Sequence, residues 1–590
     1  MRHPIPVRAG LASSLVIVAL ACGSDESTTA PPPPPPPSAN TIAVTGGDGQ
    51  SGTVATALAQ ALEVRVDDAS GQPVSGVSVT WSVVTGGGAL SSTASSTDAS
   101  GDATATYTLG TAIGTESVRA AISGSSTSVT FTLSAVAGPA ALLSTVSGND
   151  QAAAVGTAVP LPYQVRVDDQ YGNPVAGATV DWAVVRGGGS LGASSSVSDA
   201  QGFAAATHTL GSAAGGQFVE ARVQGMAGPA LRFHATAQSS FTIAAGGSNV
   251  PDRFVSDLWV HGGYGYSGTW GNRNGTPGNA LKIWRLDASG APSLIDSVIT
   301  SGITTVSDVE VSSDGSLLMF STEGGANSGL FLYRLTDPRN PTFVDNTVVS
   351  TGLHTTTFGY IGGKTYAFAA KNPTNPELRI YEIDATALNP IALVSTTPIP
   401  PAYGIHDTFV RDGVAFVLAW DTGVIAYDIG NGVMGGSPAT PVEISRVATT
   451  NGNSHNAWWF HNPNNGERRY LFVGEEGPGV IGGAASGDIH VVDVSDLSAP
   501  REVATFKIPG AGTHNFWMDE QSAVLYAAYY NAGVVAIDVS GDLSGNLANR
   551  EIARLQPGGA GNTFTWGVQL YQGSLYAADM QSGFWQLDLP

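Results

Sequence analysis

Four histidines and two aspartates recur at similar intervals in the C-terminal half of this 590-residue chain. Together with one tryptophan they stand at the start of successive repeat units, as Asp257, Asp308, His354, His406, His455, His514 and Trp566. Neutral imidazole nitrogens bind copper, zinc and iron, and carboxylates such as Asp257, Asp308 or Glu475 could complete a metal site. The seven residues are therefore candidates for a ligand-binding rim. Among them, the candidate ligands of a transition metal are His354, His406, His455 and His514.

A structural role is the alternative. Histidine or aspartate at an equivalent place in each repeat can hydrogen-bond the backbone of the neighbouring repeat and seal the space between them. Other motifs add no chemistry: Gly263–Gly268 matches G-x-G-x-x-G without a following helix, and the chain contains no G-x-S-x-G, H-E-x-x-H or P-loop sequence. No catalytic residue is assigned, and a binding protein is favoured over an enzyme.

Seven short phrases, each an apolar strand followed by a charged residue and another apolar residue, have their charged residue 22 to 38 residues after these positions. The charged residues are Arg285, Arg334, Glu382, Asp428, Asp493, Asp538 and Asp588, separated by 49, 48, 46, 65, 45 and 50 residues. That period suits one four-stranded blade, so residues 240–590 are predicted to form a β-propeller of about seven blades. The opening strand of a blade lies nearest the axis, and the seven candidates should therefore surround the central channel.

The last phrase ends one residue before Pro590, which leaves the seventh blade without an outer strand. An open blade would expose a sheet edge. Phe241–Ala244 is predicted to pair beside Gly583–Leu589 and close the ring.

Some phrases resemble a known repeat. Val492–Pro500 (VDVSDLSAP) and Leu335–Pro341 (LTDPRNP) resemble the LVIVD repeat of bacterial surface and secreted propellers. Ser454–Trp458 and Thr513–Trp517 are similar to the blade openings of that family. The resemblance implies a fold more than an activity.

A second repeat, with an offset of 101 residues, occupies the middle of the chain. Val64–Asp68 (VRVDD) returns as Val165–Asp169, and Trp81 returns as Trp182. The size and strand pattern predict two immunoglobulin-like sandwiches, at 41–137 and 138–239. The stretch resembles bacterial Ig-like domains of the intimin and invasin type, which implies spacer or adhesive domains without catalytic residues.

The N-terminus predicts export. A positively charged start and the apolar run Leu11–Ala21 fit a signal peptide at 1–21. Ala19–Cys22 (ALAC) resembles the lipobox of bacterial lipoproteins, which implies lipidation of Cys22, the only cysteine, and sorting to the outer membrane. An ordinary secretory leader with an incidental cysteine is the alternative. Residues 22–40, with seven consecutive prolines, are predicted to form an extended tether.

Composition agrees with an all-β chain. Gly (75) and Pro (34) are abundant and only 12% of residues are charged, as expected for short strands joined by tight turns. The formal charge of −22 disfavours nucleic acid as a partner. The sequence therefore predicts a lipid-anchored cell-surface binding or adhesion protein, attached to the membrane by its lipid and presenting its propeller to an extracellular protein or glycan. The alternative is a metal-dependent propeller enzyme, for which the transition metal would be the one cofactor.

Overall fold

The computed structural model describes residues 38–286, 292–372, 375–399, 404–477 and 479–590. The predicted signal peptide, Cys22 and the tether up to Pro37 lie outside these residues. Apart from one short 3-10 turn, η1 (Ala548–Arg550), every element in the described residues is a β-strand. No helix in this part of the chain is long and apolar enough to cross a membrane. The predicted all-β class is confirmed.

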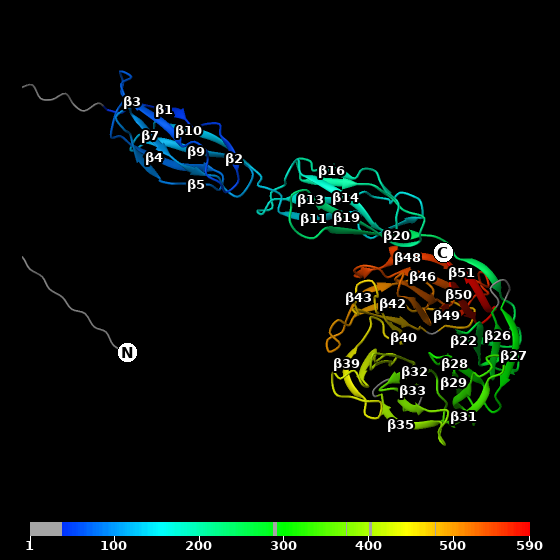
Figure 1. Cartoon of the computed structure of the whole chain (residues 1–590). Helices are drawn as coiled ribbons and strands as arrows, with labels where there is room; N and C mark the ends of the chain where they lie inside the picture. The colour runs from blue at the N-terminus through cyan, green and yellow to red at the C-terminus, as the bar shows by residue number, and fades with distance from the viewer. Residues whose placement is uncertain (1–37, 287–291, 373–374, 400–403, 478) are drawn as a thin grey trace, which may run out of the picture. The chain divides into compact units, whose positions relative to one another are not determined.

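The chain divides into two compact units between Ala137 and Gly138. The first unit holds one sandwich of two sheets (Figure 1). Its sheets are β1 (Thr41–Gly46), β3 (Leu62–Asp67) and β7 (Asp102–Ala105), and β2 (Ser51–Thr53), β10 (Ser128–Val136), β9 (Gly114–Ile122), β4 (Ser78–Thr85) and β6 (Ala94–Ser96). A two-stranded ribbon pairs β5 (Ala89–Leu90) with β8 (Tyr107–Thr108).

The second unit begins with a sandwich of the same topology. Its sheets are β11 (Leu142–Ser147), β13 (Tyr163–Asp168) and β17 (Phe203–Ala206), and β12 (Gln151–Ala154), β20 (Leu231–Gln238), β19 (Gly215–Val223), β14 (Thr179–Arg186) and β16 (Ser195–Val197). The ribbon pairs β15 (Ser190–Leu191) with β18 (His208–Thr209). Two immunoglobulin-like sandwiches are thus confirmed.

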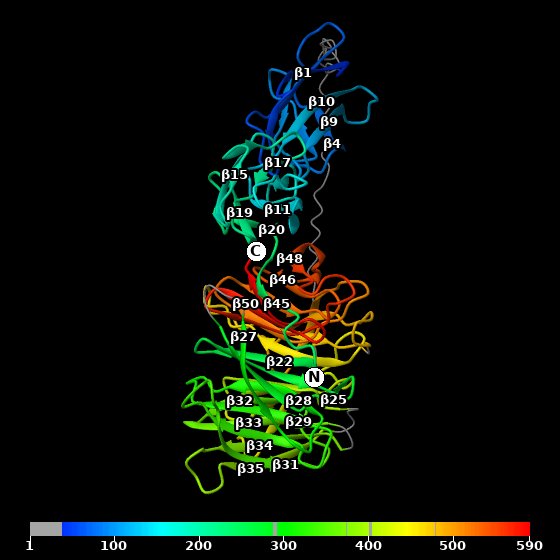
Figure 2. The ribbon, with the colours of Figure 1, turned by 90° about the vertical axis from the view of Figure 1, so that its right-hand side faces the viewer.

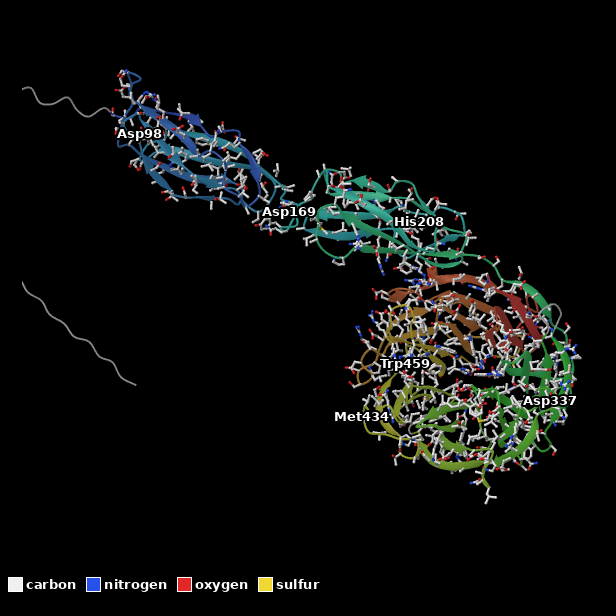
Figure 3. All side chains as sticks on the ribbon, viewed as in Figure 1. Asp98, Asp169, His208, Asp337, Met434 and Trp459 are labelled. Carbon is white, nitrogen blue, oxygen red and sulfur yellow. The ribbon has the colours of Figure 1, made fainter. Side chains whose placement is uncertain are left out.

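The repeated tryptophan has the same role in both sandwiches. Trp81 donates its Nε1–H to Ser95 at 2.9 Å, and Trp182 donates to Ser196 at 2.9 Å. Each indole packs between the sheets, where apolar residues alternate with polar ones along the strands. His208 lies inside the second sandwich (Figure 3), with Nδ1 3.2 Å from the hydroxyl of Tyr163. This buried histidine is a packed core residue.

Seven sheets surround a common centre in the rest of the chain (Figures 1 and 2). Blades 1 to 3 are β22 (Phe254–His261), β23 (Tyr264–Trp270), β26 (Ala280–Arg285) and β27 (Ser293–Ile299); β28 (Thr305–Val311), β29 (Leu317–Glu323), β30 (Gly329–Arg334) and β31 (Thr342–Val348); and β32 (Thr356–Ile361), β33 (Lys364–Lys371), β34 (Glu377–Ile383) and β35 (Ile391–Pro398). A small ribbon, β24 (Asn272–Arg273) with β25 (Thr276–Pro277), extends blade 1.

Blades 4 to 7 follow the same plan. They are β36 (Asp407–Arg411), β37 (Val414–Leu418), β38 (Val424–Asp428) and β39 (Val442–Val447); β40 (Ser454–Trp459), β41 (Tyr470–Glu475), β42 (Ile489–Asp493) and β43 (Arg501–Phe506), joined by β47 (Gly545–Asn546); β44 (Phe516–Asp519), β45 (Val524–Ala528), β46 (Val534–Asp538) and β48 (Glu551–Leu555); and β49 (Thr565–Tyr571), β50 (Ser574–Asp579), β51 (Gly583–Asp588) and β21 (Thr242–Gly246). The seven repeated phrases form the third strands, and seven blades are confirmed.

The ring closes as predicted. β21 pairs antiparallel with β51, with Thr242 opposite Asp588 and Gly246 opposite Trp585. The hydroxyl of Thr242 also donates to Asp588 at 3.0 Å. The fourth strand of blade 7 therefore comes from the segment that precedes blade 1, so the edge of the last blade is covered.

The second sandwich contacts blade 6, where β20 lies close to β48 (Figure 2). The backbone N–H of Ser239 donates to the carbonyl of Ile552 at 2.9 Å, and Gln238 donates to the carbonyl of Glu551 at 3.1 Å. Side chains of both domains extend this junction.

Candidate functional site

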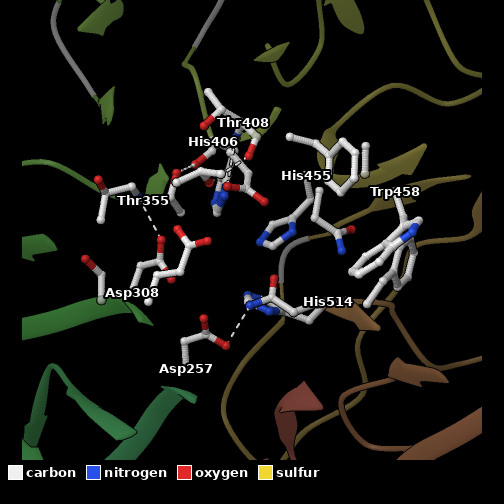
Figure 4. A pocket seen from close by; sticks show the side chains of 18 of the residues that line it. Asp257, Asp308, Thr355, His406, Thr408, His455, Trp458 and His514 are labelled. Atoms are coloured by element: carbon white, nitrogen blue, oxygen red, sulfur yellow. Dashed lines mark hydrogen bonds between the residues drawn. The ribbon is translucent and has the colours of Figure 1, made fainter. Parts of the chain in front are cut away.

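A cavity of about 230 Å³ lies at the centre of the propeller, lined by residues of the inner strands and the turns before them. It is lined by all seven residues that the repeats single out, namely Asp257, Asp308, His354, His406, His455, His514 and Trp566. Figure 4 shows His406, His455 and His514 facing Asp257 and Asp308 across this space. The sequence-based placement around one channel thus agrees with the structure, whereas their role in binding stays a prediction.

The seven residues form two layers, and this corrects the expectation that all are equivalent. In blade 2 the ladder shifts register between Val306 and Asp308, which leaves Ser307 as the bulged residue. In blade 5 the same shift, between Ser454 and Asn456, leaves His455 as the bulged residue. Ser307 is therefore the counterpart of His455, and Asp308 is equivalent to Asn456, one residue beyond the histidine position. Blade 1 has the same shift before Leu258, which places Asp257 beside Asp308.

The histidine layer is a nearly continuous ring of aromatic groups. The ring centroids of His354 and His406 are 4.1 Å apart, those of His406 and His455 are 4.0 Å apart, and those of His455 and His514 are 4.0 Å apart. Trp566 continues the series 3.9 Å from His514. All five side chains are buried, so this layer forms the inner end of the cavity.

The adjacent layer carries carboxyl groups, and burial acts on all of them. Burial and the neighbouring Asp308 raise the pKa of Asp257 well above its usual range. Burial likewise raises the pKa of Asp308, raises that of Glu310 well above its usual range, and brings that of Asp407 to about 7. Neither lysine nor arginine occurs among the described residues that line the cavity. The described lining residues therefore offer no cationic partner to an anion, which favours neutral or positively charged ligands.

Some of the cavity-lining side chains also have the alternative, structural role of hydrogen-bonding another blade. Asp308 accepts a hydrogen bond from the backbone N–H of Thr356 in blade 3 at 2.7 Å (Figure 4). Nδ1 of His514 lies 2.7 Å from the carbonyl oxygen of Trp566 in blade 7. Asn515 donates to Asp257 at 2.9 Å, which joins blades 6 and 1. These side chains hold the blades together, in the last case across blade 7, as well as lining the cavity.

Other imidazole nitrogens have no such partner. Within the described residues, neither nitrogen of His455 has a hydrogen-bond partner, nor does Nδ1 of His406 or Nε2 of His514. A neutral imidazole always carries one N–H, and leaving such a group buried and unpaired costs about 1–3 kcal/mol. Several unpaired imidazole nitrogens that face one cavity indicate that a bound ligand or ion supplies the missing partner.

The other end of the cavity is aromatic and more open. Trp259, Phe409, Trp458 and Trp517 are half-buried, in contrast to the buried histidines. Trp458 and Trp517 lie with ring centroids 5.4 Å apart, and Glu520 accepts the Nε1–H of Trp458 at 3.2 Å. Ligands therefore reach the cavity past these rings.

Two neighbouring aromatics do not belong to this mouth. Trp459 and Phe460 are buried between blades: the indole of Trp459 packs against Phe416, with ring centroids 5.5 Å apart, and Phe460 packs against Phe472. Adjacent residues on a strand point to opposite sides, so Trp458 and Trp459 cannot both face the channel.

The glutamate that faces the histidine layer is Glu476, and not Glu475 as predicted from the sequence. Glu475, proposed as a possible ligand, instead lies on the far side of β41, 3.2 Å from Nε2 of His490. Its neighbour Glu476 faces the histidine layer, with Oε2 3.4 Å from Nε2 of His406 and 3.8 Å from Nε2 of His455. Strand alternation at the end of β41 is the signal that could have separated the two glutamates.

Comparison with known proteins supports the two sandwiches. Residues 43–134 and 143–242 match the family model described as bacterial Ig-like domain (group 1). Such domains are typical of bacterial cell-surface proteins. No curated protein matches the chain significantly.

Solved structures show similarity at low identity. The D0-D1 domain of intimin is 22% identical with a TM-score of 0.15, over 33% of this chain and 98% of its own. The β-propeller domain of Cps50 (Swd1) from Myceliophteria thermophila is 12% identical with a TM-score of 0.42, over 59% of this chain and 100% of its own. The C-terminal WD40 domain of Sif2 is 10% identical with a TM-score of 0.38, over 77% of this chain and 100% of its own. These similarities are too distant to indicate an activity.

Proposed function

We propose that this chain is a lipid-anchored protein of the bacterial cell surface, attached through Cys22 to the outer membrane. Its two Ig-like domains serve as a spacer, and its propeller, similar to LVIVD-repeat propellers, binds an extracellular glycan in the central cavity. The presence of two bacterial Ig-like domains supports the surface location. This role is that of an adhesion or binding module, and it requires no catalytic residues.

The proposal that the ligand is a glycan rests on the residues that line the cavity mouth. Sugar rings present an apolar face to aromatic side chains and hydroxyl groups to polar ones, and sites that combine the two are concave and largely pre-formed. Here half-buried Trp259, Trp458 and Trp517 stand above a layer that contains Asp407 and Asn515. The absence of cationic side chains among the described lining residues supports a neutral glycan over an anionic one.

A glycan array probed with the full chain tests this proposal. Trp458→Ala and Trp517→Ala should each weaken binding about tenfold, since a stacking contact contributes about 1.4 kcal/mol. Phe343→Ala is the matched control, because Phe343 is an aromatic residue that is 51% exposed on β31, the outer strand of blade 2. Binding that survives both tryptophan changes, or a protein partner captured equally by all variants, would place the ligand site outside the cavity.

A further inference from the structure

Three potential metal ligands converge at the inner end of the cavity. His406 precedes β36, His455 lies on β40, and Glu476 directly follows β41, so two neighbouring blades supply them. One ligand atom from each lies within 4.8 Å of the other two. Tetrahedral coordination with metal–ligand distances of about 2.0–2.2 Å places ligand atoms about 3.3 Å apart, close to the 3.4 Å between His406 Nε2 and Glu476 Oε2.

A third imidazole offers a free lone pair beside this cluster. Nδ1 of His514 lies 2.7 Å from the carbonyl oxygen of Trp566, which can only accept, so Nδ1 carries the proton. Nε2 of His514 is then an unprotonated acceptor, and it has no hydrogen-bond partner among the described residues. A histidine held by a backbone carbonyl through one nitrogen is the usual arrangement for binding metal through the other. The rings of His514 and His455 are in contact, with centroids 4.0 Å apart.

Surrounding side chains hold the ligands in place. The ring of His406 stacks on Trp420, with centroids 4.8 Å apart and planes at 16°. The hydroxyl of Tyr530 donates to Oε1 of Glu476, which leaves Oε2 toward the histidines. Trp420 and Tyr530 both have positive φ angles, 53° and 37°, which bulky side chains rarely adopt. The strained turns thus bring these two aromatic groups over the cluster.

His354 already has a carboxylate partner, because its Nδ1 lies 3.1 Å from Oε1 of Glu323. His354 is therefore expected to support His406 as a neighbour, with centroids 4.1 Å apart, without binding the ion.

We infer that the inner end of the cavity binds one divalent transition metal ion through Nε2 of His406, Nε2 of His455 and Glu476, with His514 beside these three ligands. Imidazole and carboxylate together suit zinc, iron or copper. This metal site is separate from the proposed glycan binding. Its ion is what a metal-dependent reaction in this cavity would require. Of the four histidines that the repeats indicate, the ligand set keeps His406 and His455 and adds Glu476.

Zinc titration of the full chain tests the inference. The purified protein is stripped with a chelator, titrated with Zn²⁺ by calorimetry, and analysed for bound zinc by atomic emission; Co²⁺ is then used to report tetrahedral coordination by its visible absorption. One ion per chain is expected. His455→Ala and Glu476→Gln should each weaken binding at least tenfold, whereas His354→Ala and the control His261→Ala should retain one ion, because His261 lies outside the cavity.

Each outcome decides between explanations. If His455→Ala fails to fold, the near-isosteric variant Glu476→Gln is used to test the site instead. Equal zinc binding by the His455→Ala/Glu476→Gln double variant would show adventitious binding only, and absence of zinc from the wild-type chain would overturn the site. Loss of zinc from His354→Ala with retention by Glu476→Gln would refute this ligand set. The glycan array is independent of the ion: zinc failure with intact glycan binding refutes this inference alone.

Discussion

Nε2 of His234, in the second sandwich, lies 2.6 Å from Oδ2 of Asp538, at the end of the third strand of blade 6. Nδ1 of the same ring lies 3.0 Å from Asp150, which also pairs with Arg550 at 2.6 Å. His234 and Asp538 are both buried, and Thr236 donates to Asp538 at 3.2 Å. The junction between sandwich and propeller is therefore a buried network of charges that depends on a histidine.

This network predicts a pH-dependent junction. Burial lowers the pKa of His234, but Asp538 and Asp150 raise it by more, so its folded value exceeds the unfolded one of about 6.5. Its contribution to stability is complete below about pH 6.5 and is lost as pH rises through the folded pKa. The pKa values of Asp150 and Asp538 are lowered, burial notwithstanding, so their contribution is lost as pH falls below about 4. We expect the junction to be most stable between about pH 4 and 6.5.

His234→Gln checks this expectation. The melting temperature of the full chain relative to this variant should be higher at about pH 5.5 than at about pH 8, since glutamine does not titrate. Phe218, whose ring centroid is 5.1 Å from that of His234, provides the control: Phe218→Leu should shift both melting temperatures equally. A difference between wild type and His234→Gln that is the same at both pH values would contradict the role of the imidazolium.

Closure of blade 7 by β21 gives a second prediction. A chain that begins at Ser256 lacks β21, whereas one that begins at Gln238 keeps it and the buried ring of Phe241. Losing several ladder hydrogen bonds at about 1 kcal/mol each should destabilise the shorter chain by about 3 kcal/mol or more and expose a sheet edge. Thermal melting and light scattering of the two chains measure this. Equal melting temperatures would mean that the outer strand of blade 7 is dispensable.

Asp308 gives a prediction about the seams between blades. Asp308→Ala leaves the backbone N–H of Thr356 without its acceptor at the cavity wall, and should lower the free energy of unfolding by about 1–3 kcal/mol. Asp308→Asn keeps an acceptor oxygen and should cost less. Urea denaturation of the full chain compares them. If the alanine variant were as stable as the asparagine variant, the contact would contribute nothing to holding blades 2 and 3 together.

If Cys22 is lipidated, the protein should be found in the membrane fraction. Cys22→Ser should release the protein into the soluble fraction, because acyl chains provide stable anchoring that a tether alone does not. Cell fractionation followed by immunoblotting measures the change, with Ser24→Ala as the control. A serine variant that still sediments with membranes would show that another element attaches the protein.

The repeats predict most of the architecture, because strand patterns and turn residues recur in both halves. The phrase Ala536–Val539 begins within β46 (Val534–Asp538), and its Asp538 accepts hydrogen bonds from the N–H and hydroxyl of Ser540. The phrase therefore encodes the end of a strand and the cap of its turn. Offset counting likewise places Trp81 and Trp182 in equivalent cores.

The details of the site depend on geometry that the repeats do not encode. The β-bulge that blades 2 and 5 share makes Ser307, and not Asp308, the counterpart of His455, and no local residue type marks this bulge. Glu476 belongs to a segment inserted in blade 5 alone, so no other blade predicts its direction. The pairing of His234 with Asp538 joins residues 304 positions apart, and only the docking of two domains brings them together.

The most direct test of the central claim is a crystal structure of the full chain with the best ligand from the glycan array. We expect a sugar ring stacked on Trp458 or Trp517, with its hydroxyl groups toward Asp407 and Asn515 inside the propeller cavity. A glycan bound on the outer strands of the blades or on either sandwich, with the cavity free of it, would contradict the claim.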